Sequence, residues 1–337
     1  MTRHEPLSPS TREHARQQSR GLALGFLGVA VFAMTLPMTR LAVGPASDPQ
    51  LPPLFVTAGR AACAGLLSAA FLLAVGASRP PRSHARGLAV CALGTVVGFP
   101  LFLSLALRHV DAMHAAVVTG VLPLATAITA AIAFRQRPSA GFWLCAGAGA
   151  ALVLGFAAWK GAGRLGAADL LLLCSMASAA IGYVAGARLA GEMAAERVIC
   201  WVLVASLPVT MPVMLLSWPQ QPASAAAWGG FAYVTVFSMW LGFFAWYRGL
   251  ALGGTVRVSQ VQLVQPFLAM LFAVPILGER LDAATLGFAL AVVATVVVGR
   301  LMPVGVPQGA SVDMPPAPMQ VPIDIASAVP SAVTRRS

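Results

Sequence analysis

The chain has 337 residues, of which 58% are hydrophobic and only 10% are charged, and its mean hydropathy is +0.80. Soluble proteins are about 45–50% apolar and about 25% charged, so this composition excludes a soluble domain, whose surface needs far more charge. The formal net charge of +11 is explained by loop arginines that set membrane topology, and we expect no nucleic-acid partner. The composition therefore predicts a polytopic membrane protein.

Residues 1–20 are polar, and we expect them to form a cytoplasmic N-terminal tail. The apolar stretch Gly21–Val43 follows them. It is longer than the apolar core of a signal peptide, and no convincing small-residue cleavage site comes after it. We therefore interpret it as a retained first membrane span.

A membrane-spanning helix needs about 20 mostly apolar residues, and ten segments meet this requirement. They are Gly21–Val43, Pro53–Val75, Gly87–Leu107, Ala112–Phe134, Gly141–Trp159, Ala168–Ala187, Ile199–Trp218, Trp228–Trp246, Val256–Leu277 and Ala284–Met302. The segments lack the alternation of barrel strands, so we expect helices joined by short loops. Residues 303–337 contain seven prolines, and we expect them to form a disordered tail.

The distribution of basic residues predicts the orientation in the membrane. If the N-terminus is cytoplasmic, 16 of the 22 arginines and lysines lie on the cytoplasmic side, five lie on the other side and Arg60 lies within a span. Because cytoplasmic loops carry an excess of these residues, we expect both termini to be cytoplasmic. The predicted location is the inner cell membrane.

Two apolar stretches of the chain resemble each other without gaps at an offset of 143 residues. Leu107–Val153 matches Leu250–Val296 at positions that include Pro123/Pro266 and Arg137/Arg280. The mid-segment prolines Pro123 and Pro266 carry most of the weight, because alanine matches are common in an alanine-rich chain. Duplicated hydrophobic units are typical of secondary transporters, whose binding site lies between two related halves.

The duplication predicts two units, at residues 21–157 and 168–302, with five spans each. Because five is an odd number, the second unit must be inverted relative to the first. The expected fold is therefore an all-α polytopic membrane protein, with ten transmembrane helices arranged as two inverted five-helix repeats.

Polar residues deep in the predicted spans gather on the fourth and ninth helices. They are Thr119, Pro123 and Thr126 on the fourth helix, and Ser259, Gln262, Gln265 and Pro266 on the ninth. A proline kinks a helix, and the carbonyl that it frees at membrane depth needs a partner or a wet cavity. We predict that these residues line the substrate cavity. The alternative is that the glutamines join neighbouring helices by hydrogen bonds.

Four other residues are candidates for a role in transport, and each has an alternative role. Ser175 could line the same cavity, although its small neighbours also suit helix packing, and Trp240 could stack on a substrate or belong to the core. Arg60 lies roughly 10 Å into its span and could attract a substrate carboxylate, or it could snorkel or bind neighbouring carbonyls. His114 could take part in proton coupling.

None of the eleven acidic residues maps to the interior of a predicted span. Intramembrane carboxylates mark proton relays and cation sites, so their absence argues against a carboxylate-driven antiporter. It also argues against an intramembrane protease or metal enzyme, which needs acids, histidines or thiols that converge at depth. We therefore expect no enzymatic activity, no metal site and no cofactor.

Several short sequence features lie along the chain in a characteristic order and spacing. They are Arg60, Ala106–Arg108, Pro123, Pro266 and Leu277–Glu279. With the ten-span layout, the chain from about residue 20 to 302 resembles the EamA-like branch of the drug/metabolite transporter superfamily. The first unit departs from the family pattern, because Arg135-Gln136 stands where the family usually has Gly-Glu.

The resemblance implies a secondary transporter that exports a small organic metabolite, often an amino acid or a related compound, by alternating access. Its partners would be that solute and the lipid bilayer, and it would act as a monomer or homodimer. One alternative is a flippase for lipids or lipid-linked sugars, which would have a cavity open to lipid. Another is a non-transporting scaffold or sensor, although neither tail could fold into a signalling domain.

Overall fold

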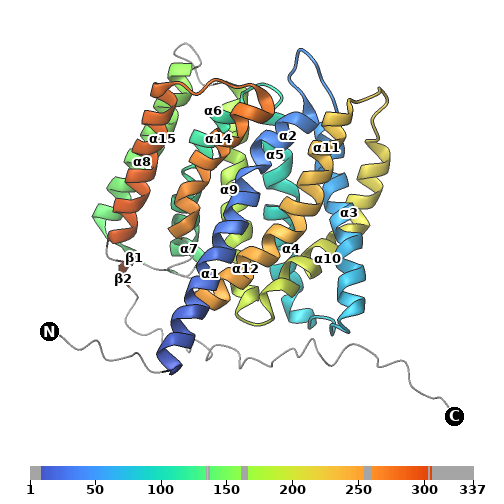
Figure 1. Cartoon of the computed structure of the whole chain (residues 1–337), viewed down its shortest axis with the longest axis vertical. Coiled ribbons are helices and arrows are strands. Elements are labelled where there is room, and N and C mark those ends of the chain that lie inside the picture. Colours follow the sequence, from blue (N-terminus) through green and yellow to red (C-terminus); the bar gives the residue numbers. More distant parts are fainter. Residues whose placement is uncertain are drawn as a thin grey trace.

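The computed structural model describes residues 9–133, 135, 137–160, 166–253, 260–302 and 304–305. Its helices lie side by side and run between two ends of the molecule (Figure 1). We call the end that carries the loops 44–52 and 278–282 the upper end. The other end, where the first helix begins, is the lower end.

The helices follow one another with short connections. In the N-terminal half they are α1 (Pro9–Ala33), α2 (Thr35–Val43), α3 (Pro53–Ala74), η1 (Arg82–His84), α4 (Ala85–Cys91), η2 (Ala92–Gly98), α5 (Phe99–Ala106), α6 (Ala112–Thr119), α7 (Leu122–Ala133) and α8 (Ala140–Lys160). In the C-terminal half they are α9 (Ala167–Ala190), α10 (Ala195–Leu216), α11 (Ala225–Tyr233), η3 (Val234–Leu241), α12 (Gly242–Gly253), η4 (Gln260–Val264), α14 (Gln265–Leu277) and α15 (Ala283–Leu301). The two-residue strands β1 (Arg137–Pro138) and β2 (Val304–Gly305) pair antiparallel.

Eight helical stretches among the described residues are long and apolar enough to cross a membrane. Two further apolar helices, Val261–Leu277 and Ala283–Gly299, are shorter and correspond to the predicted ninth and tenth spans. The predicted ninth span begins at Val256, and residues 254–259 lie outside the described part of the chain, as does most of the predicted C-terminal tail. The helical character of the predicted fold is confirmed.

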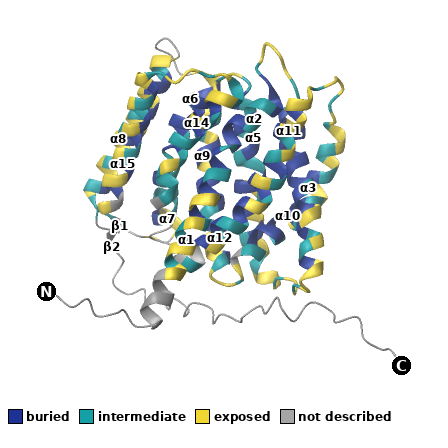
Figure 2. Ribbon diagram, in the orientation of Figure 1, coloured by how far each residue is buried: buried dark blue, intermediate teal, exposed yellow. Residues whose placement is uncertain are grey.

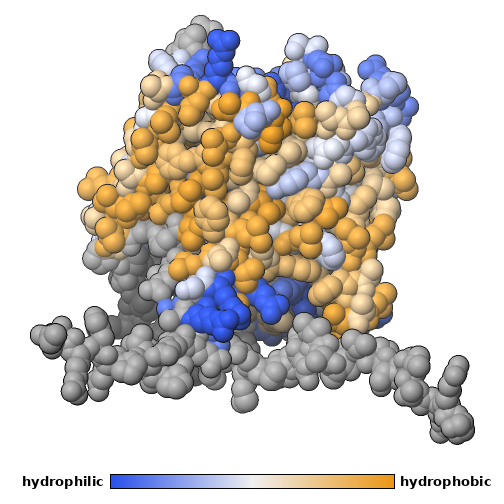
Figure 3. All heavy atoms as spheres, viewed as in Figure 1, coloured by the Kyte–Doolittle hydropathy of each residue, from blue (hydrophilic) through white to orange (hydrophobic). Residues whose placement is uncertain are grey.

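The surface between the two ends is apolar. Hydrophobic side chains dominate the middle of the molecule, and hydrophilic ones gather at its upper and lower ends (Figure 3). Buried residues lie where the helices face one another, and exposed residues follow the outer helix faces (Figure 2). Large side chains such as Leu144 and Leu216 are 74% and 86% exposed. An apolar belt of this size suits lipid rather than water.

The helices approach each other most closely at glycines. A Cβ on Gly94 of η2 would lie 2.5 Å from the carbonyl oxygen of Ser178, and one on Gly182 of α9 would lie 2.7 Å from the backbone nitrogen of Thr95. The crossing of α1 and α12 repeats this pattern, because a Cβ on Gly249 would lie 2.6 Å from a backbone atom of α1. Without a hydrophobic force between helices in lipid, such close packing provides much of the association.

The two prolines of the duplicated stretch begin helices instead of kinking them. The chain leaves the helix near Gly120, and Pro123 is the second residue of α7. Pro266 holds the same position in α14, directly after the 3-10 segment η4. The missing N–H of proline removes no intrahelical bond in the first turn, which explains why the helices restart at these points. The predicted kink is therefore a break in the fourth helix.

Candidate transport site

A cavity of about 160 Å³ lies between the halves of the chain, and we call it the central cavity. Its walls come from α6, α7 and the turn between them, and from α9, η4, α14 and α15. The lining residues are Thr119, Gly120, Leu122, Pro123, Thr126, Tyr183, Gln262, Leu263, Gln265, Pro266 and Val293. Six residues that the sequence singled out thus meet around one space. Ser259, the seventh of that group, lies outside the described residues.

The broken helices give this cavity its polar groups. The hydroxyl of Thr119 donates to the carbonyl of Ala116 (3.0 Å), and that of Thr126 donates to the carbonyl of Leu122 (2.9 Å). Both hydroxyl oxygens keep acceptor capacity for a solute. The end of α6 and the start of α7 lie at the cavity wall, and so does the junction of η4 with α14, so helix ends of both signs line it.

A second, smaller space of about 40 Å³ adjoins the central cavity, and we call it the Arg60 chamber. The two spaces share Thr119, Leu122, Tyr183 and Gln265 as lining residues. The other lining residues of the chamber are Phe32, Thr35, Leu36, Arg60, Thr95, Phe99, Met176, Ser238, Met239 and Phe243. The chamber is therefore a largely apolar pocket around one guanidinium group.

Arg60 is 2% exposed and has little compensation from the described residues. Its Nη2 donates to Oγ of Ser238 over 3.0 Å, and this oxygen lies 2.8 Å from Oγ1 of Thr35. Its Nε and Nη1 have no hydrogen-bond partner within the described part of the chain, and no described carboxylate pairs with it. An arginine at the centre of a membrane helix is unfavourable by about 2.5–3.5 kcal/mol on insertion scales. The snorkelling alternative does not describe this buried side chain.

Ser238 belongs to the π-helical segment η3, and Thr95 belongs to the π-helical segment η2. The two segments fall in the predicted third and eighth spans, at nearly the offset of the sequence duplication. A π-helical segment turns side chains out of the regular helical order, and such segments are frequent at functional sites. Here both segments contribute a hydroxyl to the wall of the Arg60 chamber.

Two residues of the predicted site do not line these spaces. Ser175 is fully buried, and its hydroxyl donates to the carbonyl of Phe99 over 2.9 Å, which ties α9 to α5. The ring of Trp240 packs against the rings of Phe244 and Phe71, with centroid separations of 5.2 and 6.4 Å. These contacts fit the alternative of helix packing for Ser175 and the alternative of a core position for Trp240.

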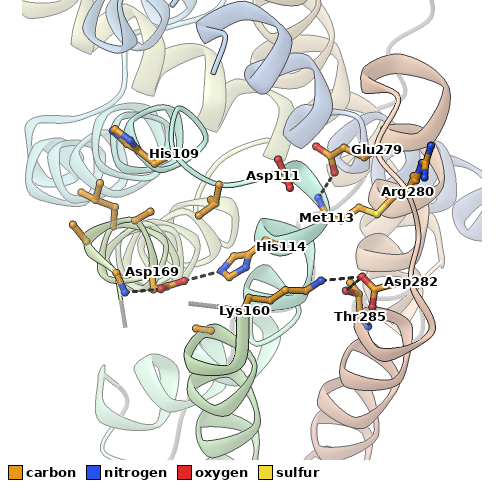
Figure 4. A pocket seen from close by; sticks show the side chains of 16 residues that line it. His109, Asp111, Met113, His114, Lys160, Asp169, Glu279, Arg280, Asp282 and Thr285 are labelled. Carbon is orange, nitrogen blue, oxygen red and sulfur yellow. Dashed lines mark hydrogen bonds and ion pairs between the residues drawn. The ribbon is translucent and has the colours of Figure 1, made fainter. Parts of the chain in front are cut away.

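A polar pocket of about 720 Å³ opens at the upper end, and we call it the upper vestibule (Figure 4). Glu279 reaches from the loop after α14 to the first turn of α6. Its two oxygens accept hydrogen bonds from the backbone N–H groups of Ala112 (2.7 Å) and Met113 (2.8 Å). Asp111, the residue before α6, makes no side-chain cap. A carboxylate from the C-terminal half therefore caps a helix of the N-terminal half.

Burial raises the pKa of Glu279, and the nearby carboxylate of Asp111 raises it further. The two backbone donors and Arg40 oppose this shift without cancelling it. The carboxyl group of Glu279 is therefore easier to protonate than that of an exposed glutamate.

Two side-chain contacts also join the halves across the upper vestibule (Figure 4). Nε2 of His114 lies 2.7 Å from Oδ1 of Asp169, so the predicted proton-coupling residue is a bridge between α6 and α9. Nζ of Lys160 lies 2.9 Å from Oδ2 of Asp282, and this contact joins α8 to α15. Hydrogen bonds from Lys160 and Thr285 hold the pKa of Asp282 well below its usual range.

Thr35 and Ser238 beside Arg60 were not predicted from the sequence, and neither was the partner of Glu279. Single hydroxyls in apolar segments carry no signal of their own, because serine and threonine also bond within their own helices. The π-helical turn that aims Ser238 at Arg60 is not visible in the residue pattern. For Glu279, the available signal was its place after Leu277 and Gly278, but the sequence did not indicate its contact with α6.

Comparisons with known proteins agree with this arrangement. The model of the EamA-like transporter family matches the chain twice, at residues 19–157 and 166–300. The chain is 42% identical over 287 residues to the uncharacterized transporter YdeK of Bacillus subtilis (strain 168), over 84% of this chain and 97% of that protein. A solved crystal structure with 18% identity shares the fold with a TM-score of 0.57, covering 84% of this chain and 99% of the other. These matches confirm the resemblance seen in the sequence, and the chain belongs to the EamA-like transporter family of multi-pass membrane proteins.

Proposed function

We propose that the protein is a secondary transporter that exports a small organic metabolite across the inner cell membrane by alternating access. The observation that carries this proposal is the central cavity, which lies between the two halves and takes Thr119 from one half and Gln262 from the other. In transporters built from related halves, the substrate binds between them near the middle of the membrane.

The contacts of the upper vestibule support a gate at that end. Glu279, His114–Asp169 and Lys160–Asp282 all join the two halves there. If the halves rock against each other, these contacts break together when the upper end opens. The restarts of α7 and α14 would then act as the hinges, because each interrupts a span at the level of the cavity.

We further propose that the halves are inverted five-helix repeats with both termini in the cytoplasm. The distribution of arginines and lysines supports this orientation. The two-fold match of the family model, the paired prolines and the paired π-helical segments η2 and η3 support the repeat. In this orientation the upper vestibule faces away from the cytoplasm.

Release from liposomes tests transport directly. Purified protein is reconstituted into liposomes loaded with a mixture of amino acids and small organic acids, and the external solution is analysed by mass spectrometry. We expect faster release of at least one solute than from protein-free liposomes, and release at the protein-free rate for the whole mixture would contradict the proposal. The double variant Thr119→Val, Gln262→Leu replaces two polar side chains of the cavity by apolar side chains of similar size. We expect it to release the solute more slowly than the wild type.

A further inference from the structure

Building on the proposed function, we propose that the transported solute is a small organic acid with a net negative charge, and that Arg60 binds its carboxylate. The guanidinium of Arg60 lines the Arg60 chamber, and this chamber shares the lining residues Thr119, Leu122, Tyr183 and Gln265 with the central cavity. A solute that occupies both spaces would therefore meet a positive charge.

The hydrogen-bonding state of Arg60 points to an anion. The side chain of Arg60 is only 2% exposed, and only its Nη2 has a described partner, the neutral hydroxyl of Ser238. Nε and Nη1 are without a partner among the described residues. A guanidinium presents its donors in a planar fork that matches the two oxygens of a carboxylate. A bound carboxylate would supply both the missing acceptors and the missing negative charge.

The charge balance of the two spaces distinguishes an organic acid from a zwitterion or a cation. The described lining residues include one arginine and no aspartate or glutamate. The ammonium group of an amino acid would meet no carboxylate here. The charge balance therefore favours an acid without an ammonium group.

The helix ends beside the cavity nearly cancel in charge. Leu122 and Pro123 begin α7, and Gln265 and Pro266 begin α14, and all four line the central cavity. The partially positive starts of these helices lie next to the partially negative ends of α6 and η4. The positive charge of the two spaces is therefore that of Arg60.

The sizes and surfaces of the spaces suggest how such a solute would lie. The Arg60 chamber, at about 40 Å³, has room for a head group of a few atoms, and the central cavity, at about 160 Å³, has room for the remainder. Phe99, Met176 and Phe243 give the chamber an apolar wall around the charge. A phosphate carries about −1.5 to −2 charges at neutral pH, and no second cation lines the described walls to match it. A monocarboxylate fits better.

Ligand-induced thermal stabilisation tests this charge assignment. The full chain is purified in detergent, and its Tm is measured with benzoate and hexanoate, with their neutral amides benzamide and hexanamide, with benzylammonium, and with inorganic phosphate. A ligand that binds the folded state raises Tm by an amount that grows with the ratio of its concentration to its Kd. We expect at least one of the two acids to raise Tm more than its own amide, and more than benzylammonium or phosphate.

Variants of Arg60 locate the effect. Arg60→Gln should weaken the apparent affinity for the acid by about thirtyfold or more, because the buried charge partner is lost. Arg60→Lys keeps the charge but loses the planar fork of donors. Its affinity for the acid should lie between that of the wild type and that of Arg60→Gln. Arg86→Gln removes an exposed arginine that lines neither space, and it should bind as the wild type does.

Three results would overturn the inference: equal or absent Tm shifts for the acids and amides, a larger shift with phosphate or benzylammonium, or full acid binding by a folded Arg60→Gln protein. The comparison of acid with amide uses the wild-type protein, so it holds even if Arg60→Gln does not fold. Binding in detergent needs no translocation. Acid-selective binding without release from liposomes would therefore contradict the proposed transport and leave the charge assignment standing.

Discussion

The backbone N–H of Met113 donates a hydrogen bond to Oε2 of Glu279 over 2.8 Å, and these residues belong to different halves of the chain. Gly278, which precedes Glu279, ends α14 in the left-handed conformation with φ of 68°. Glycine reaches this conformation without the steric penalty of a side chain. The glycine turn thus directs the carboxylate to the N-terminus of α6, where it joins the two halves of the chain.

Glu279→Ala should open the upper end, because it removes the carboxylate that caps α6. Hydrogen bonds to charged groups contribute about 1.5–3 kcal/mol each, so the closed arrangement should become at least about tenfold less favoured. A single cysteine at position 119, in a chain without its native cysteines, reports the opening. Its labelling by a maleimide that does not cross the membrane should accelerate from the side of the upper end.

Two controls accompany that labelling experiment. Glu279→Gln keeps one acceptor oxygen, so the cysteine at position 119 should be labelled more slowly than in Glu279→Ala. Glu192→Ala removes a carboxylate that pairs with His84, away from the upper vestibule, and it should leave the rate unchanged. Unchanged labelling in Glu279→Ala would show that this contact does not hold the upper end closed.

Acidification should favour the closed upper end. The pKa of Glu279 is raised by burial in the closed arrangement, and a solvated glutamate in an open arrangement would have its ordinary pKa. The closed form then binds the proton more tightly, so its stability is gained as pH falls through the raised pKa and lost as pH rises through it. Labelling of the same cysteine should slow in that pH window, and Glu279→Gln should remove the pH dependence. Faster labelling at lower pH would contradict this sign.

Gly94→Ala should destabilise the crossing of η2 and α9. The added methyl group would lie 2.5 Å from the backbone carbonyl oxygen of Ser178, which cannot turn away as a side chain can. Overpacking of this kind reduces stability by about 1–3 kcal/mol. Gly155→Ala in α8 is the matched control, because a Cβ there meets no atom within 4 Å. Thermal unfolding in detergent measures both variants, and equal Tm values would contradict the close packing.

Asp282→Ala should reduce stability more than Lys160→Met. Asp282 accepts from the backbone nitrogen of Thr285 at the start of α15, and loss of such a cap reduces stability by about 1 kcal/mol. The pair with Lys160 is partly exposed and contributes below about 1 kcal/mol. Because the pKa of Asp282 is lowered, its contribution is present above the ordinary pKa and is lost as pH falls. Unfolding followed at neutral and acidic pH checks the order and the sign.

Much of the fold could be predicted from the sequence, because membrane helices have a strong and local signal. The apolar segments gave helices near their expected bounds, and Pro123 and Pro266 marked the level of the central cavity. The break near Gly120 was not predicted, since a proline is compatible with both a kink and a new helix start. The π-helical segments were not predicted either, because their residues are ordinary for a membrane helix.

The candidate site was only partly predictable. Thr119, Gln262 and Gln265 stood out because polar side chains are scarce at membrane depth. Ser175 and Trp240 also stood out, but their contacts with Phe99 and Phe71, which are distant in sequence, place them in helix packing. The contact of Glu279 with α6 spans 167 positions in the chain, and no local pattern reveals a contact at that separation.

Export through the central cavity is tested most directly by comparing the solutes that cells release into the growth medium. Cells that overexpress the wild type are compared with cells that hold an equal amount of folded Gln262→Leu protein, and small organic solutes in the medium are quantified. We predict that at least one solute accumulates outside the wild-type cells and falls severalfold with Gln262→Leu. Identical solute profiles would contradict transport through this cavity.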